Sequence, residues 1–479
     1  MNMWIYGESI GFKDREKIDI YNPATLEIID SVPVANEKDI NLAIECALNE
    51  FENWSKTLMF ERIKIIRKFA DLLEKEYEEI AQIESKEMGK PITQARNEVK
   101  GAGETARQIS EYARTIGGEV LPISNLPSAG KDLLLTIREP YGVVAAVVPF
   151  NYPISQCILK IVPALLMGNT VIVKPASEAP LSNIMLIELL YKAGMPPKAI
   201  QIVTGSGSKI GRMLATDPRI SVISLTGSTR TGIEIAKRAA ETLKHVLLEL
   251  GGNDPLIILR DADIEYAVSE AVIGRYGCSG QICCGSKRFI VPRELKSEFI
   301  QKLAKKIKEK KFGDPSEETT EIGPLVSESA AKHAEKQIEI VVAQGGKIIM
   351  GGNRFKNTYI EPTIIEVNRD NEIAKDMEIF APVWPIIVYD TIEEAIQIAN
   401  QTCYGLSAGC IGNNYQELLR IAKEVKAGCV VMNGCGNYQT KDQAFGGVKM
   451  SGNAREGGHY VLEEFSQITT IVFRKAFDY

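Results

Sequence analysis

A cysteine and a glutamate are the residues of this chain best suited to chemistry on a carbonyl group. The thiol belongs to Cys283, in Gly280-Gln281-Ile282-Cys283, and the carboxylate belongs to Glu249, 34 residues earlier. The chain has only three histidines, so a Cys-His or Ser-His pair has few candidates. A cysteine without a neighbouring imidazole needs backbone dipoles, a cation or a bound cofactor to stabilise its thiolate. These residues therefore indicate cofactor-assisted chemistry rather than a protease.

Two glycine-rich turns and a lysine are candidates for binding a phosphate group. The turns lie around Gly207 and Gly227, each after a predicted strand, and Lys174 ends another predicted strand. Glycines let the backbone approach a diphosphate, and the helix that follows presents free N–H groups to it. The turn at Gly227 lacks the Gly-Lys-Ser/Thr of a P-loop. Taken singly, each turn fits an ordinary strand-helix connection equally well, and Lys174 fits a surface lysine.

An asparagine stands where another predicted strand passes into a helix. It is Asn151, in Pro149-Phe150-Asn151-Tyr152-Pro153. Its amide could donate a hydrogen bond to an oxyanion that develops during a reaction. The alternative is that its side chain caps the helix.

Length, charge and cysteine usage exclude several classes of protein. With 479 residues the chain has room for two or three domains. A net charge of -6 offers no basic field for nucleic acid, and the basic cluster at 305–311 is interpreted as a solvated helix face. We expect no membrane span and no signal peptide. Nine cysteines in mostly apolar runs predict reduced thiols in a cytoplasmic enzyme, and the absence of a second close pair predicts no metal site.

The hydrophobic pattern predicts the elements that position these residues. Helical periodicity at 40–54, 62–75 and 98–117 is followed by extended segments at 133–139 and 142–148. Apolar strands at 170–173, 200–203 and 220–225 then alternate with helices. The alternation resumes with strands at 256–259, 288–291, 347–350 and 385–388 and helices around 263–275, 294–311, 328–344 and 392–400. This predicts an α/β fold of two doubly wound parallel-sheet domains joined near residue 250.

The tail at 468–474 alternates like a single exposed strand. An unpaired strand edge is normally protected, so we expect it to pair with another subunit. The alternative is that it joins a sheet of its own chain.

Taken in order and spacing, these motifs resemble the aldehyde dehydrogenase superfamily, in its NAD(P)-dependent, hydrolytic, non-CoA-acylating type. The resemblance covers essentially the whole chain and includes Tyr21-Asn22-Pro23-Ala24-Thr25, Glu378-Ile379-Phe380-Ala381-Pro382-Val383, Tyr404-Gly405-Leu406-Ser407 and Phe445-Gly446-Gly447-Val448-Lys449-Met450-Ser451-Gly452. It implies a Rossmann-like dinucleotide-binding domain of residues 1–120 and 141–249 and a catalytic domain of residues 250–430. Residues 121–140 and 465–479 would be oligomerisation strands in a homodimer or homotetramer, and 431–464 a returning segment lining the active site.

The resemblance also assigns catalytic roles. Cys283 would attack the aldehyde carbon, with Asn151 and the Cys283 backbone N–H as the oxyanion hole. Glu249 would activate the water that releases the carboxylic acid from a thioester. Glu456 resembles a residue that relays the proton, although a surface carboxylate is the alternative.

On the cofactor side, Lys174 would bind the adenosine ribose and Ser228 the diphosphate, while Glu378 would bind the nicotinamide ribose beside Phe380. The full set of expected cofactor residues is Pro149, Phe150, Lys174, Ser177, Gly207, Gly227, Ser228, Thr231, Leu250, Glu378 and Phe380. Many NAD-preferring members carry glutamate where this chain has Ser177. A hydroxyl there does not repel a 2′-phosphate, so we expect NADP use or dual use. Ala381 and Asn253 also depart from the family pattern, without touching an assigned role.

The resemblance places the substrate tunnel at Tyr152, Ser155, Gln156, Leu159, Gly277, Ile282 and Cys284. Members that act on glyceraldehyde 3-phosphate or succinate semialdehyde have arginines at positions matching Ile282, Leu159 or Gly277. Without them a strongly anionic substrate is disfavoured, and a small neutral or hydroxylated aldehyde such as lactaldehyde or glyceraldehyde is favoured. Lys441 is a remaining source of charge. The alternatives are a semialdehyde dehydrogenase, a CoA-acylating relative, which the presence of Glu249 disfavours, and a catalytically silent scaffold.

Overall fold

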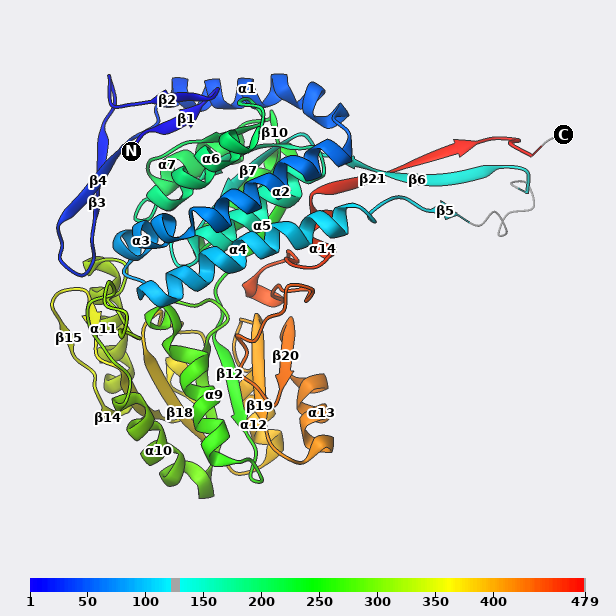
Figure 1. Ribbon diagram of the computed structural model, residues 1–479. Coiled ribbons are helices and arrows are strands. Elements are labelled where there is room, and N and C mark those ends of the chain that lie inside the picture. The colour runs from blue at the N-terminus through cyan, green and yellow to red at the C-terminus, as the bar shows by residue number, and fades with distance from the viewer. Residues whose placement is uncertain (122–129, 478–479) are drawn as a thin grey trace.

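Near-continuous apolar runs form the central strands of two large sheets. The computed structural model describes residues 1–121 and 130–477, and Figure 1 shows two α/β halves with a slender arm projecting from the first. Within the described ranges, no helix has an apolar stretch long enough to cross a bilayer.

The first half is built on a seven-stranded sheet. Its strands lie in the order β11 (His245–Glu249), β10 (Ile220–Thr226), β7 (Val143–Val147), β8 (Thr170–Lys174), β9 (Ile200–Ile202), β1 (Met3–Ile5) and β2 (Glu8–Ile10). The five strands from β11 to β9 are parallel, as predicted, whereas β1 and β2 extend the sheet antiparallel. The predicted doubly wound parallel sheet is therefore confirmed for these five strands, and β1 and β2 add an antiparallel hairpin at its edge, where no crossover helix is needed.

Helices cover both faces of this sheet because side chains along each strand alternate in direction. Val144 and Ala146 of β7 pack in one core with α2 (Met59–Lys75), α4 (Ile92–Ala113), α5 (Pro153–Leu166) and α6 (Leu181–Ala193). Val143 and Ala145 pack in the other with α1 (Glu37–Lys56), α7 (Gly207–Thr216) and α8 (Thr229–Ala239). Helix α3 (Tyr77–Met88) was not predicted, and α4 begins six residues before the predicted helix.

The second half has the same plan. Its strand order is β14 (Lys347–Met350), β17 (Thr363–Val367), β18 (Val383–Tyr389), β13 (Ser286–Pro292), β12 (Asp254–Ile258), β19 (Ser407–Ile411) and β20 (Cys429–Met432), parallel except for β14. One face packs against α9 (Ile264–Tyr276) and α10 (Lys296–Lys308), the other against α11 (Glu328–Ala343), α12 (Ile392–Asn400) and α13 (Tyr415–Glu424).

The arm joins distant parts of the chain. Strand β21 (Ser466–Phe473) pairs antiparallel with β6 (Leu133–Pro140), which also pairs with β5 (Val120–Leu121). The tail therefore adds to its own chain's sheet, which is the alternative that the sequence left open, and the predicted pairing with another subunit stays a prediction for its outer edge. Parts of the predicted oligomerisation strands, residues 122–129 and 478–479, lie outside the described residues. The remaining short elements are α14 (Tyr460–Glu464) and the hairpins β3 (Lys17–Tyr21) with β4 (Ile28–Pro33) and β15 (Arg354–Phe355) with β16 (Tyr359–Ile360).

Candidate active site

The candidate residues gather at the carboxyl ends of parallel strands. Lys174 is the last residue of β8 and Glu249 the last of β11, while Gly227 directly follows β10. Asn151 lies between β7 and α5, and Gly207 opens α7 just after β9. Because these strands run in one direction, their ends share one edge of the sheet, where open α/β sheets bind ligands.

A cavity of about 570 Å³ occupies this edge. Every residue predicted to bind a cofactor lines it, and so do Asn151 and Cys283. The predicted cofactor residues are Pro149, Phe150, Lys174, Ser177, Gly207, Gly227, Ser228, Thr231, Leu250, Glu378 and Phe380. The structure therefore brings residues from both halves of the chain into one cavity, with the thiol among them.

The Lys174 end of the cavity is suited to an anion. The Lys174 ammonium is buried and donates to the Pro175 carbonyl at 2.6 Å, and burial lowers its pKa to about 8. A Cβ built on Gly207 would lie 3.7 Å from its Nζ, so the ammonium rests against the first turn of α7. The Ser177 hydroxyl donates to the Gly205 carbonyl at 3.1 Å. A cation and a helix N-terminus thus converge on this end.

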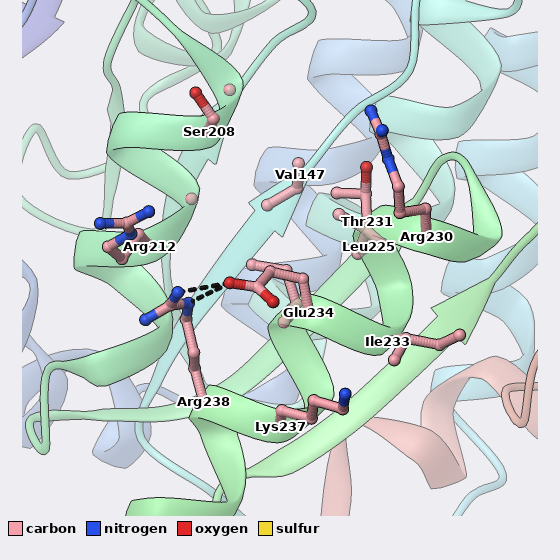
Figure 2. A pocket seen from close by; sticks show the side chains of 13 residues that line it. Val147, Ser208, Arg212, Leu225, Arg230, Thr231, Ile233, Glu234, Lys237 and Arg238 are labelled. Carbon is pink, nitrogen blue, oxygen red and sulfur yellow. Dashed lines mark hydrogen bonds and ion pairs between the residues drawn. The ribbon is translucent and has the colours of Figure 1, made fainter.

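A second pocket of about 560 Å³ continues from the cavity between α7 and α8 (Figure 2). It shares four lining residues with the cavity: Val147, Gly207, Leu225 and Thr231. Its other walls carry basic side chains, Arg212 from α7 and Arg230, Lys237 and Arg238 from α8. Glu234 accepts a hydrogen bond from Arg238 at 2.9 Å. One of these four cations is thus neutralised by this carboxylate, and the pocket keeps a positive balance.

The loop before Cys283 is held in an unusual backbone conformation. Cys278 and Ser279 have φ of 46° and 55°, which side-chain-bearing residues adopt at a cost of roughly 1–3 kcal/mol each. The Gln94 side chain accepts from the Cys278 N–H at 2.8 Å, and Ser279 donates to the Gly323 carbonyl at 2.9 Å. Gly280 follows with φ of 79°, where a Cβ would lie 2.4 Å from the Ala381 carbonyl oxygen. The surroundings therefore fix this strained loop and the thiol at its end.

Asn151 contacts this loop directly. Its buried Nδ2 donates to the Gln281 carbonyl at 2.8 Å. The cap position of α5 is held by Tyr152, so the helix-cap alternative for Asn151 was wrong. The Cys283 N–H has no acceptor within residues 1–121 and 130–477. The Cys283 N–H and the second hydrogen of the Asn151 amide are therefore two free donors in the cavity that Cys283 lines.

Glu249 is a buried carboxyl group without hydrogen bonds. It is 4% exposed, and neither of its oxygens has a partner in the described part of the chain. Burial raises the pKa of Glu249 well above its usual value, and the nearby Glu456 and Cys283 raise it further. Lys160 and Arg455 act in the opposite direction. A carboxylate so poorly solvated is a strong base once ionised.

Glu456 is buried and belongs to a chain of polar contacts, so the surface alternative was wrong. It forms an ion pair with Lys160 at 2.9 Å and accepts from the Gln156 amide at 3.3 Å. The Thr226 hydroxyl donates to the side-chain carbonyl oxygen of Gln156 at 2.9 Å. These contacts connect the neighbourhood of Glu249 with the end of β10.

A segment near the C-terminus fixes the backbone around Glu249. The Leu250 N–H donates to the Ser451 carbonyl at 2.9 Å, and the Asn453 N–H donates to the Leu248 carbonyl at 3.0 Å. Residues 451–453 therefore pair along β11, which is an edge strand of the first sheet.

Four of the seven predicted substrate residues lie around the thiol. Tyr152, Ile282 and Cys284 share an apolar cluster with Cys283. A Cβ on Gly277 would lie 3.0 Å from the Ile282 side chain and 3.9 Å from the Tyr152 hydroxyl. The other three contact different surroundings. Leu159 packs against the helical core of the first half, the Ser155 N–H donates to Glu98, and Gln156 belongs to the Glu456 contacts.

Several site residues escaped the sequence reasoning. Lys160 follows Gln156 by four residues, and Gln337 likewise follows His333 along α11, so helical periodicity could have placed each pair on one face. His333 and Gln337 line the cavity. The buried Lys287, four residues after Cys283, was also missed, because it lies just before the predicted apolar strand 288–291, where a lysine gives no sign of burial. Asn253, by contrast, donates to two backbone carbonyls and has a structural role.

Comparison with known proteins agrees with this geometry. The aldehyde dehydrogenase family model matches residues 11–471. A mitochondrial succinate-semialdehyde dehydrogenase of Arabidopsis thaliana is 37% identical over 97% of this chain and 87% of its own length. A lactaldehyde dehydrogenase of Methanococcus aeolicus is 37% identical over 98% and 99%. The crystal structure of glyceraldehyde-3-phosphate dehydrogenase GapN from Methanocaldococcus jannaschii, complexed with NADP, superimposes with a TM-score of 0.92 at 36% identity, covering 96% of this chain and all of that one. The chain therefore belongs to the aldehyde dehydrogenase family and is an NAD(P)-dependent aldehyde oxidoreductase with a two-domain α/β fold.

Proposed function

We propose that the protein oxidises a small neutral or hydroxylated aldehyde to its carboxylic acid, with NADP favoured over NAD. The observation that carries this proposal is the single cavity that has Cys283 and Asn151 among its walls together with Lys174 and Ser177. Lactaldehyde and glyceraldehyde are the substrates that fit this class best.

The cavity fits a dinucleotide in its donor set. It offers a buried ammonium at Lys174 and the N-termini of α7 and α8, with Ser228 at the cap of α8. These groups would hold the ribose and the diphosphate, and Glu378 would hold the second ribose. The oxidised nicotinamide, when bound, accepts a hydride.

Cys283 and its neighbours would carry the oxidation step. The Cys283 thiolate attacks the aldehyde carbon, and the carbonyl oxygen becomes an oxyanion in a tetrahedral thiohemiacetal. The Cys283 N–H and the free hydrogen of the Asn151 amide donate to that oxyanion, and one such donor stabilises a transition state by about 3–4 kcal/mol. Hydride then leaves the same carbon, so the oxyanion collapses to a thioester on Cys283.

Glu249 would carry the hydrolysis step. As a carboxylate it removes a proton from water, and the hydroxide attacks the thioester carbon. Collapse of the second tetrahedral species breaks the carbon–sulfur bond, which releases the acid and restores the thiolate. Glu456 and Lys160 would return the proton from Glu249 toward solvent. A buried base at this position supports hydrolysis over transfer to coenzyme A.

The preference for NADP rests on the charges around Ser177. Ser177 puts no carboxylate at this position to repel a 2′-phosphate, and the pocket that continues toward Arg212 is positively charged, although Glu178 beside Ser177 also lines the cavity. The NADP complex of the GapN relative supports the same preference.

A neutral substrate is supported by the pairing of three lysines, Lys90, Lys160 and Lys441, with carboxylates. Lys90 lies 4.1 Å from the Tyr152 ring centre, yet it is paired with both Glu84 and Glu98. Lys160 is paired with Glu456, and Lys441, which the sequence left open, is paired with Glu104. A buried carboxylate or phosphate would therefore meet cations that are already neutralised. The names of relatives that act on succinate semialdehyde or 3-sulfolactaldehyde make an anionic semialdehyde the second candidate.

We further propose a cytoplasmic homodimer or homotetramer. All nine cysteines are free thiols, which supports a reducing compartment. The arm exposes Ile468, Val472 and Phe473 along an edge strand, and a second copy of the chain would cover them. We also propose the domain division that the sequence predicts, with residues 1–120 and 141–249 as the dinucleotide-binding domain and residues 250–430 as the catalytic domain.

The test is reduction of NAD and NADP followed at 340 nm with acetaldehyde, lactaldehyde, glyceraldehyde, succinate semialdehyde and benzaldehyde, with and without coenzyme A. We expect turnover without coenzyme A, highest with the hydroxylated aldehydes and with NADP. A Cys283→Ser variant with full turnover would contradict the assigned nucleophile. Higher kcat/KM for succinate semialdehyde than for lactaldehyde would favour the second candidate.

A further inference from the structure

A buried lysine contacts both the backbone of the nucleophile and a carboxylate that lines the cofactor cavity. Lys287, on β13, is 1% exposed. Its ammonium donates to the Cys283 carbonyl and, at 3.4 Å, to the Gly285 carbonyl. On its other side it forms an ion pair with Glu378 Oε1 at 3.3 Å, and it lies 5.9 Å from the centre of the Phe380 ring. One cation thus contacts both the loop that carries the thiol and a carboxylate that lines the cavity.

Its contacts are suited to positioning. A lysine ammonium has three hydrogens, and the two backbone carbonyls and Glu378 match that number. The two carbonyls belong to Cys283 and Gly285, so the ammonium fixes the turn that follows the nucleophile. Glu378 also accepts from the Gly252 N–H at 3.3 Å, so the lysine and the backbone hold its carboxylate between them. Burying a lysine is costly unless it is paired and hydrogen-bonded, as it is here.

The charge of Lys287 also acts on the thiol. Four ionisable groups face Cys283: Cys284 beside it, Lys287 on β13, Asp254 on β12 and Glu249 at the end of β11. The contact with Cys284 and burial raise the pKa of Cys283, and so does Asp254. Lys287 lowers it. Lys287 is the cation among these four groups, and the other three disfavour a thiolate.

We propose that Lys287 is a positioning residue that holds the Cys283 turn and the Glu378 carboxylate in place and favours the thiolate of Cys283. This inference rests on the proposed roles of Cys283 and Glu378. It adds a link between the thiol and the cofactor cavity that runs through one side chain of β13.

The test measures thiol reactivity apart from aldehyde oxidation. Iodoacetamide alkylation of Cys283 in the cofactor-free enzyme is followed against pH by peptide mass spectrometry. In Lys287→Met we expect the profile to move to higher pH and alkylation at neutral pH to slow roughly tenfold, the scale of effect when an opposite charge is removed. Lys287→Arg should restore the profile because it keeps the charge. The KM for NADP should rise in Lys287→Met more than kcat falls, because Glu378 loses its partner.

Lys244 provides the matched control. It is also buried and donates to two backbone carbonyls, of Asp217 and Ile220, but it precedes β11 at the end away from Glu249. Lys244→Met should lose thermal stability like Lys287→Met while keeping the alkylation profile of the wild type. An equal shift in both variants, or an unchanged profile in Lys287→Met, would overturn the proposal.

Two further results separate this proposal from the proposed function. If Lys287→Met does not fold, Glu378→Gln replaces it: removing the counter-charge should move the alkylation profile to lower pH, and an unmoved profile would refute the role of Lys287. Turnover that survives Cys283→Ser would instead refute the proposed function, whatever the alkylation profiles show.

Discussion

Replacing Ser177 by glutamate should convert the enzyme from NADP to NAD use. Ser177 lines the cavity at the Lys174 end, and its hydroxyl is held by the Gly205 carbonyl at 3.1 Å. A glutamate carboxylate at this position would repel a 2′-phosphate bound at this end of the cavity. Two unit charges about 4 Å apart repel by roughly 1 kcal/mol in water and roughly 4 kcal/mol at an effective dielectric constant of 20. The half-buried position of Ser177 places the repulsion between these limits.

The expected outcome is a change in the ratio of two rate constants. A repulsion of about 1–4 kcal/mol corresponds to a fall of roughly fivefold to a thousandfold in kcat/KM for NADP relative to NAD. Initial rates at 340 nm with one aldehyde and both nucleotides measure this ratio. Ser177→Gln is the matched control, because it has the size of glutamate without the charge. The reasoning would be refuted if Ser177→Glu and Ser177→Gln each lowered kcat/KM equally for NADP and for NAD.

Three other predictions follow from buried carboxyls and from the arm. Glu249→Gln should give a single rapid burst of NADPH followed by slow turnover. It should also abolish the fall in steady-state rate that the wild type shows as pH drops through the raised pKa of Glu249. Quench-flow kinetics across pH test this, and a linear time course at the wild-type rate in the variant would contradict it. Glu87 is fully buried, accepts from the Leu181 and Ser182 N–H groups, and has a pKa that burial raises to about 7. Because the native state binds this proton more tightly than the unfolded state does, the contribution of Glu87 to the free energy of unfolding is complete below about pH 4.5 and is lost as pH rises through 7. Denaturant melts across this range should show a loss of about 3 kcal/mol that is absent in Glu87→Gln. Truncation after residue 465 should lower the mass measured by light scattering by at least half, and an unchanged mass would place the interface elsewhere.

The hydrophobic pattern was enough to place the central strands, whereas the full set of cofactor residues came from the resemblance to the family. Strands buried on both faces must be apolar throughout, so β8, β10 and β12 stood out. The residues that follow such strands must meet at one edge, which is why Lys174 and Gly227 could be placed in one cavity. The edges were less predictable: β14 was placed at its observed residues, but its pattern did not show that it runs antiparallel to β17, and β1 has only three residues.

Contacts between distant side chains could not be read from the chain. Glu456 is buried against Lys160, which lies 296 residues earlier in the chain. The side of Leu159 that faces the helical core, and the pairing of Lys441 with Glu104, depend in the same way on how helices pack. Local pattern reports which face of an element is apolar but not which partner covers it.

The pairing of residues 451–453 with β11 also has a consequence during synthesis. Glu249 leaves the ribosome about 200 residues before Ser451, which at 5–20 residues per second is a delay of roughly 10–40 s. Throughout that time the outer edge of the first sheet has no partner from its own chain, and residues 451–453 do not yet hold the backbone at Glu249. A nascent chain, or one cut short by premature termination, therefore carries the nucleophile without a positioned base.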